Sequence, residues 1–395
     1  MTNWRGVWAV FAGGLVAAAH ITKVSPALPA LREQLGLTLV QSGLIATMFN
    51  VMGMTVGMLA GVLCDRLGHK RLALFGLSVM VAGGGLGAAA AGFRVLLLSR
   101  FLEGVGFIVY VVSAPALITA AAGASAHERS RALALWSSYM PTGGTVALLV
   151  APALIAAWGW RGLWGGIALA TALTALVFWR VVPAAPYGAI RSLRLVVESL
   201  AQKGNLAMAA LFAFYVAQWN SVMVWLPTFL VEEHGASTRT AAIATALMVL
   251  ANAPGTLAGG WLLSRGMRRS TLIVCGALLG AACELGMFSD ALPSTLRFGS
   301  VLAFSFCTGV IPASIFAGLP IHARTPQHIS TGNGIINQAS QAGQFFGPLF
   351  LAWLASRLGW QASLWAMLMF ACGGGLCGLV IGAIENRRHR ASSSV

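Results

Sequence analysis

The sequence predicts an all-helical membrane protein with twelve transmembrane helices arranged as two six-helix bundles. Three observations support this fold class: apolar segments of spanning length recur along the chain, charged residues are scarce, and basic residues gather in alternate loops. Hydrophobic residues make up 58% of the chain and charged residues only 9%, whereas about 25% of an ordinary soluble domain is charged. A water-soluble fold could not cover its surface with so little charge, so most of the surface must face lipid.

The apolar segments have the length of membrane-spanning helices. About 20 helical residues cross a hydrocarbon core about 30 Å thick, and a helix satisfies its own backbone hydrogen bonds, as lipid requires. The short alternating segments typical of membrane β-barrels do not occur in the sequence. We expect an N-terminal bundle over 1–182, a cytoplasmic linker over 183–204, a C-terminal bundle over 205–384 and a cytoplasmic tail over 385–395. The expected spans are 6–30, 40–63, 71–92, 95–119, 132–157, 162–182, 205–230, 239–263, 271–289, 295–320, 331–355 and 361–383.

The placement of the basic residues predicts the orientation. A net charge of +15 could suggest a nucleic-acid partner, but the basic residues sit in short loops between the spans. When the loops are assigned alternately to two sides, most basic residues fall on one side, which the positive-inside rule makes cytoplasmic. An odd number of spans would scramble this asymmetry. We therefore expect a multi-pass protein of the bacterial inner membrane with both termini cytoplasmic and no nucleic-acid partner.

The two halves of the chain resemble each other. Gly57-Met-Leu-Ala-Gly61 in the second span recurs as Gly255-Thr-Leu-Ala-Gly259 in the eighth. A Gly-Trp motif precedes the sixth span at Gly159 and the twelfth at Gly359, and both repeats are offset by about 200 residues. Internal repeats of this kind are typical of secondary transporters.

The segment after the second span carries the most informative motif. It reads Gly57-Met-Leu-Ala-Gly61-Val-Leu-Cys-Asp65-Arg66-Leu-Gly68-His69-Lys70-Arg71. Small residues on one face let two helices approach closely. Asp65, at a helix end, could hold a neighbouring helix by a charge-assisted hydrogen bond that another conformation breaks.

This segment resembles the signature Gly-x-x-x-Asp-Arg-x-Gly-Arg-Arg/Lys of the major facilitator superfamily. The resemblance implies the major facilitator fold and a conformational latch formed by the matching residues. The corresponding loop of the second half has Ser264 near the acidic position, so we expect a weaker latch there or none. The matching residues are Gly61, Asp65, Arg66, Gly68, Lys70 and Arg71.

Charged residues inside the spans of the first half indicate a site. Arg100, Glu103 and the following Gly-x-Gly resemble a second motif of the superfamily. An intramembrane arginine is costly and faces the bundle interior or a cavity, although Arg100 and Glu103, one turn apart, could also form an ion pair that only packs helices. His20 and Lys23 share a face of the first span. Lys23 could instead extend outwards to the interface, and His20 could be a hydrogen-bonded packing residue.

The second half offers neutral polar side chains. Gln218 and Asn220 lie in the seventh span, while Asn337 and Gln341 share a face of the eleventh. These side chains either form interhelical hydrogen bonds or line the path of a substrate.

The scarcity of carboxylates in the spans bears on the substrate. Glu103 is one exception, and Glu284, near the outer end of its helix, is expected to be solvated. Exporters of cationic drugs need buried acids, whereas Lys23, Arg100 and His20 would attract an anion. We predict a secondary transporter that moves a small anionic solute with protons by alternating access, with Arg100 and Glu103 coupling substrate to proton. The alternative is a proton-coupled efflux pump for neutral or amphipathic drug-like compounds.

The seventh span carries a narrower resemblance. The stretch Trp219-Asn-Ser-Val-Met-Val-Trp225-Leu226-Pro227-Thr228-Phe229 is similar to that of the cyanate and 2-nitroimidazole permease family. This resemblance implies proton-linked transport of small anionic or polar solutes.

Proteins of other classes fit the sequence less well. A membrane-embedded enzyme needs a catalytic His/Asp cluster or a set of metal ligands, and a receptor would usually append a soluble output domain; the sequence has neither pattern. We expect no enzyme activity, no cofactor, no metal site and a monomer.

Overall fold

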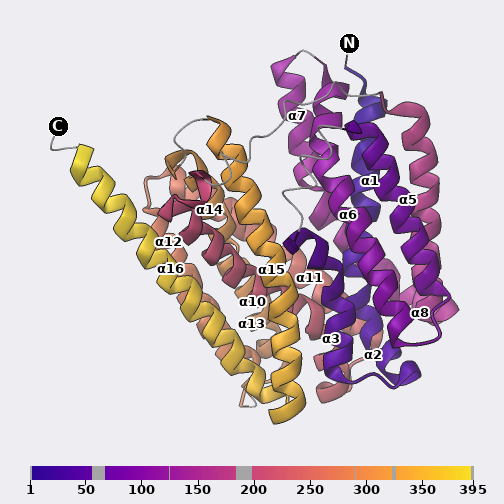
Figure 1. Cartoon of the computed structure of the whole chain (residues 1–395). Helices are drawn as coiled ribbons and strands as arrows, with labels where there is room; N and C mark the ends of the chain where they lie inside the picture. Colours follow the sequence, from indigo (N-terminus) through magenta and orange to yellow (C-terminus); the bar gives the residue numbers. More distant parts are fainter. Residues whose placement is uncertain are drawn as a thin grey trace. The chain divides into compact units, whose positions relative to one another are not determined.

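The computed structural model describes residues 2–55, 67–123, 125–183, 198–289, 291–322 and 326–392, and every regular element within them is a helix (Figure 1). Nine helical segments among these residues are long and apolar enough to cross a membrane. One of them, His127–Val181, covers two of the expected spans.

The chain divides into two compact units. The first comprises Met1–Arg191 with Val224–Ala246, and the second comprises Ser192–Met223 with Leu247–Val395. The helices α10 (Lys203–His234) and α11 (Thr238–Ser264) therefore contribute to both units. The domain boundaries expected at 182, 205 and 384 stay a prediction.

The other helices each lie in one unit. In the first unit they are α1 (Trp4–Thr22), α2 (Val24–Leu35), α3 (Leu39–Thr47), η1 (Met48–Asn50), α5 (His69–Ala88), α6 (Phe93–Ala122), α7 (Ala126–Ser137) and α8 (Tyr139–Val181). In the second unit they are α12 (Arg269–Met287), α13 (Ser294–Thr308), α14 (Val310–His322), α15 (Pro326–Leu358), η2 (Trp360–Ala362) and α16 (Ser363–Ser392).

Three breaks between consecutive helices have the same cause. Proline lacks a backbone N–H, and its ring clashes with the carbonyl group four residues earlier. The helix α1 ends at Thr22, four residues before Pro26. The same spacing separates the end of α7 from Pro141 and the end of α13 from Pro312. The first break places Lys23 at the joint between α1 and α2.

A glycine divides α8 into two arms. Gly159 has φ +66° and ψ −178°, a conformation that residues with a Cβ rarely adopt. The arms on either side correspond to the fifth and sixth expected spans.

Helices α5 and α6 run side by side in the first unit (Figure 1). Their backbones meet at Gly76 and Gly106, because a Cβ added to Gly76 would lie 2.6 Å from the carbonyl oxygen of Gly106. Such close approach between membrane helices depends on small residues. It fixes α6, which carries two of the candidate site residues, against α5.

Candidate functional site

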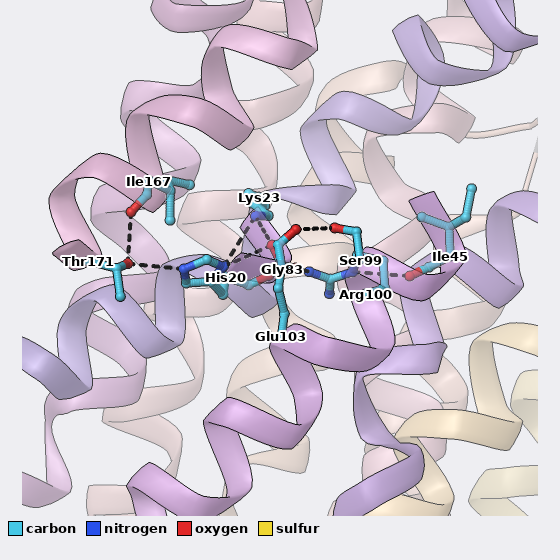
Figure 2. A network of polar contacts seen from close by, with 9 residues as sticks. All are labelled: His20, Lys23, Ile45, Gly83, Ser99, Arg100, Glu103, Ile167 and Thr171. Carbon is cyan, nitrogen blue, oxygen red and sulfur yellow. Dashed lines mark hydrogen bonds and ion pairs between the residues drawn. The ribbon is translucent and has the colours of Figure 1, made fainter. Parts of the chain in front are cut away.

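Four charged or titratable side chains meet in the interior of the first unit (Figure 2). His20 comes from the last turn of α1, Lys23 from the joint that Pro26 creates, and Arg100 and Glu103 from one face of α6. All four side chains have no exposed surface. Lys23 therefore does not extend outwards to the membrane interface.

Glu103 is the centre of this cluster. Its Oε1 accepts a hydrogen bond from Lys23 Nζ at 2.5 Å and lies 3.0 Å from His20 Nδ1. Its Oε2 accepts a hydrogen bond from Arg100 Nη1. On α5, Gly83 leaves room for the stem of this side chain, because a Cβ added there would lie 3.0 Å from Glu103 Cγ. One carboxylate thus compensates cations from two helices.

The second nitrogen of His20 is anchored on α8. His20 Nε2 lies 3.0 Å from the Thr171 hydroxyl, which itself donates to the carbonyl of Ile167 at 2.7 Å. Because the hydroxyl proton is used in that bond, Thr171 accepts from His20 Nε2–H. His20 Nδ1 lies between Lys23 Nζ at 3.2 Å and Glu103 Oε1 at 3.0 Å. It accepts from the lysine when the imidazole is neutral and donates to the carboxylate when the imidazole is protonated.

The guanidinium group of Arg100 has partners for Nε, for Nη1 and for one face, but not for Nη2. Its Nε donates to the Ile45 carbonyl at 3.2 Å, and its Nη1 donates to the His20 carbonyl at 2.7 Å as well as to Glu103. The guanidinium carbon lies 4.8 Å from the centroid of the Phe49 ring. Arg100 Nη2, although buried, has no hydrogen-bond partner among the described residues.

The cluster is positively charged overall. With the imidazole neutral, two cations, Lys23 and Arg100, face the single carboxylate of Glu103. A buried charge is stabilised only when it is paired and its hydrogen bonds are satisfied. The excess charge and the free Nη2 donor together can accept an anion. Among the described residues, no group of three or more His, Cys, Asp or Glu could hold a metal ion.

The neutral polar residues predicted in the second half do not form one cluster. Asn220 donates to the Gln344 carbonyl at 3.3 Å, which joins α10 to α15. Asn337 is exposed, and among the hydrogen bonds described its side chain donates only to Asn333 on its own helix, at 2.8 and 2.9 Å. The Oε1 of Gln341 is buried and has no hydrogen-bond partner in the part of the chain that the structure describes.

The expectation that Glu284 is solvated is wrong. Its side chain is fully buried, and its Oε1 accepts a hydrogen bond from Gln218 Nε2 at 2.6 Å. Gln218 also donates to the Met367 carbonyl on α16 at 3.4 Å. Position along a helix gives the distance from the helix end, but it does not tell which neighbouring helices cover that end. In this protein α10 and α16 cover it.

The predicted latch lies only partly within the described residues. Gly61, Asp65 and Arg66 fall outside them. Gly68, with φ +92°, is the N-cap of α5, and Lys70 and Arg71 follow in its first turn.

The second half has an ion pair where we expected a weak latch or none. Arg269, at the start of α12, pairs with Glu385 on α16 and donates from Nε to the Ser314 carbonyl at 2.8 Å. His322 Nε2 lies 3.2 Å from the same carboxylate of Glu385. Sequence reasoning missed Glu385 because its position near the end of the last span assigned it to the tail.

Helices of membrane-spanning length with charged groups buried among them are typical of membrane transporters. The family model described as Major Facilitator Superfamily matches residues 10–348. The chain belongs to this superfamily, and its fold is the all-α fold of twelve transmembrane helices in two six-helix bundles. It is a multi-pass membrane transporter for small molecules and not an enzyme.

Curated relatives match most of the chain. A putative niacin/nicotinamide transporter of Bacillus subtilis is 27% identical over 325 residues, which cover 78% of each protein. A probable sulfoacetate transporter of Cupriavidus necator is 24% identical over 380 residues, covering 87% of this chain and 85% of the relative. The narrower resemblance to the cyanate and 2-nitroimidazole permeases stays a prediction.

Solved structures show the same fold. A bacterial homologue of the human lysosomal transporter Spinster, in an inward-facing and occupied conformation, superposes with a TM-score of 0.85 at 17% identity. The match covers 95% of this chain and 96% of that structure.

Proposed function

We propose that this protein is a secondary active transporter that moves a small organic anion by alternating access, coupled to protons. One observation carries the proposal: the buried cluster around Glu103 has more cationic than anionic groups, and Arg100 Nη2 is a buried donor with no hydrogen-bond partner among the described residues. A carboxylate or sulfonate group would supply both the missing charge and the missing acceptor.

The coupling follows from competition for the same cations. In the present arrangement the Glu103 carboxylate forms ion pairs with Lys23 and Arg100. A proton bound to Glu103 would neutralise the carboxylate and leave both cations without a counter-charge. A substrate anion would then take the place of the Glu103 carboxylate beside the two cations. Binding of the anion and binding of the proton would therefore favour each other. Arg100 and Glu103 are the proposed coupling residues on this ground.

The names of the relatives support an anionic substrate. Niacin and sulfoacetate are organic acids that are ionised at neutral pH, and the transporters named for them match over most of their length. Nicotinamide, which the first name also includes, is neutral. A set of small carboxylates and sulfonates, with nicotinamide as the neutral counterpart of nicotinate, is therefore the first group of compounds to test.

Other parts of the proposal concern location and the remaining residues. We place the protein in the bacterial inner membrane as a monomer with both termini cytoplasmic, and assign the latch role to the motif between Gly61 and Arg71. Among the neutral residues Gln341 is the best candidate for a substrate contact, since its Oε1 has no partner among the described residues. Gln218, Asn220 and Asn337 already have hydrogen-bond partners.

A thermal-shift experiment on the purified protein tests the anion site. A ligand that binds only the folded state raises the transition temperature. At a free ligand concentration of 100 times the Kd, the free energy of unfolding increases by about 2.7 kcal/mol. We expect nicotinate or sulfoacetate to raise the transition temperature of the wild type but not of Lys23→Ala or Arg100→Ala.

Arg239→Ala is the matched control, because it removes an exposed cation at the start of α11 that has no described interaction with the cluster residues. It should respond to anions as the wild type does. Stabilisation by neutral amphipathic compounds alone, equal in all variants, would favour the efflux pump instead.

A further inference from the structure

The second unit contains a buried carboxyl group that the proposed anion site does not use. Glu284 lies three residues before the end of α12, and its side chain has no exposed surface. Its Oε1 accepts the 2.6 Å hydrogen bond from Gln218. Its Oε2 is buried and has no hydrogen-bond partner among the described residues.

No described basic residue makes an ion pair or hydrogen bond with Glu284. Cys283 is its neighbour on α12, and Cys307 faces Cys283 from α13. Ser300 on α13 packs against Gly286 on α12. Arg297 lies nearly one turn closer to the start of α13 than Ser300 does, so it is nearer than Glu284 to the connection between α12 and α13.

The other charged groups on the helices around Glu284 lie at distant positions. Arg269, His322 and Glu385 form their own cluster, which includes the opposite end of α12. Along α10, Lys203 and Glu232 are each about four turns from Gln218. Among the described residues, the groups that contact Glu284 are thus neutral.

The two buried glutamates of the chain are therefore in opposite situations. Glu103 is compensated by Lys23 and Arg100 and can remain a carboxylate. Glu284 has only a neutral amide as its partner. An ionised carboxylate without a cation is so costly in an apolar interior that such a group is expected to take up a proton instead.

We propose that Glu284 is a second site for the coupling proton, and that the proton occupies it in this conformation. The geometry assigns the two oxygens: Oε1 is the carbonyl oxygen that accepts from Gln218, and Oε2 carries the proton. The proton leaves to water as H⁺ when a conformational change exposes Oε2 to solvent. The carboxylate takes up a proton from water again before it returns to the buried state. The coupling part rests on the proposed function, because it assumes that a proton gradient drives transport.

Infrared difference spectroscopy tests the occupied site without any substrate. A protonated carboxyl group has a C=O stretching band that a carboxylate lacks, and at neutral pH we expect this band in the wild type. It should disappear in Glu284→Gln, whose amide has nearly the same shape as the protonated acid, and persist in the matched variant Glu103→Gln. In Gln218→Leu it should move to higher frequency, because the carbonyl oxygen loses its hydrogen bond. Absence of the band from the wild type, or its persistence in Glu284→Gln, would overturn the proposal.

Transport in proteoliposomes tests the coupling. Uptake of an organic anion is measured with and without an imposed inward proton gradient, and the ratio of the two rates reports the proton drive. We expect the ratio to be well above one for the wild type and to fall to one in Glu284→Gln. An unchanged ratio in Glu284→Gln would overturn the coupling role. If the wild type moves no anion while the infrared band behaves as expected, the proposed function fails but the proton site stands.

Discussion

Replacing Glu103 by glutamine should destabilise the protein strongly. The substitution keeps the size of the side chain but removes the one negative charge that faces Lys23 and Arg100, all fully buried. Removing one partner of a buried ion pair typically costs about 3–5 kcal/mol, because the other charge is left uncompensated. Two cations share Glu103, so we expect a value at the upper end of that range. The measurement is equilibrium unfolding of the purified protein in detergent by denaturant titration.

The chain provides a matched control in its other buried glutamate. Glu284→Gln makes the same chemical change at a site with no ion pair among the described residues, and the new amide oxygen can still accept from Gln218. We expect a change in unfolding free energy within about 1 kcal/mol, the size of one neutral hydrogen bond. If Glu103→Gln costs as little as Glu284→Gln, the cluster does not contain the buried ion pairs described above.

Two further substitutions test how the fold positions the cluster. Pro26→Ala restores a backbone donor for the Thr22 carbonyl and should straighten the joint that carries Lys23, so the anion-induced thermal shift should shrink; a shift equal to that of the wild type would contradict the role of the joint. Gly106→Val should cost about 1–3 kcal/mol of unfolding free energy by forcing α6 away from Gly76, and a thermal transition unchanged from that of the wild type would show that the two helices need not touch there.

Much of the fold could be predicted from the sequence because lipid imposes simple rules. Apolar length and the periodic placement of basic residues give the helical class, and Gly159 marks the break between the fifth and sixth spans. The helix breaks before Pro26, Pro141 and Pro312 have a local cause, but other prolines, such as Pro115 and Pro227, lie inside continuous helices. These features depend on residues close together in the chain.

The site could be predicted only where its contacts are local. Arg100 and Glu103 are one turn apart, and the structure contains the ion pair that this spacing allows. The contact of Lys23 with Glu103 joins residues 80 positions apart, and helix periodicity does not tell which faces of two helices meet. The same limit explains the wrong expectation for Glu284 and the omission of Glu385, since both depend on packing against other helices.

Uptake of a labelled organic anion into proteoliposomes tests most directly whether this protein is an anion transporter that uses the buried cluster. With an inward proton gradient, nicotinate or sulfoacetate should accumulate above the level of protein-free liposomes. Arg100→Ala should abolish this accumulation, and Arg239→Ala should leave it intact. Equal accumulation by Arg100→Ala and the wild type, or transport of neutral compounds only, would contradict the proposed function.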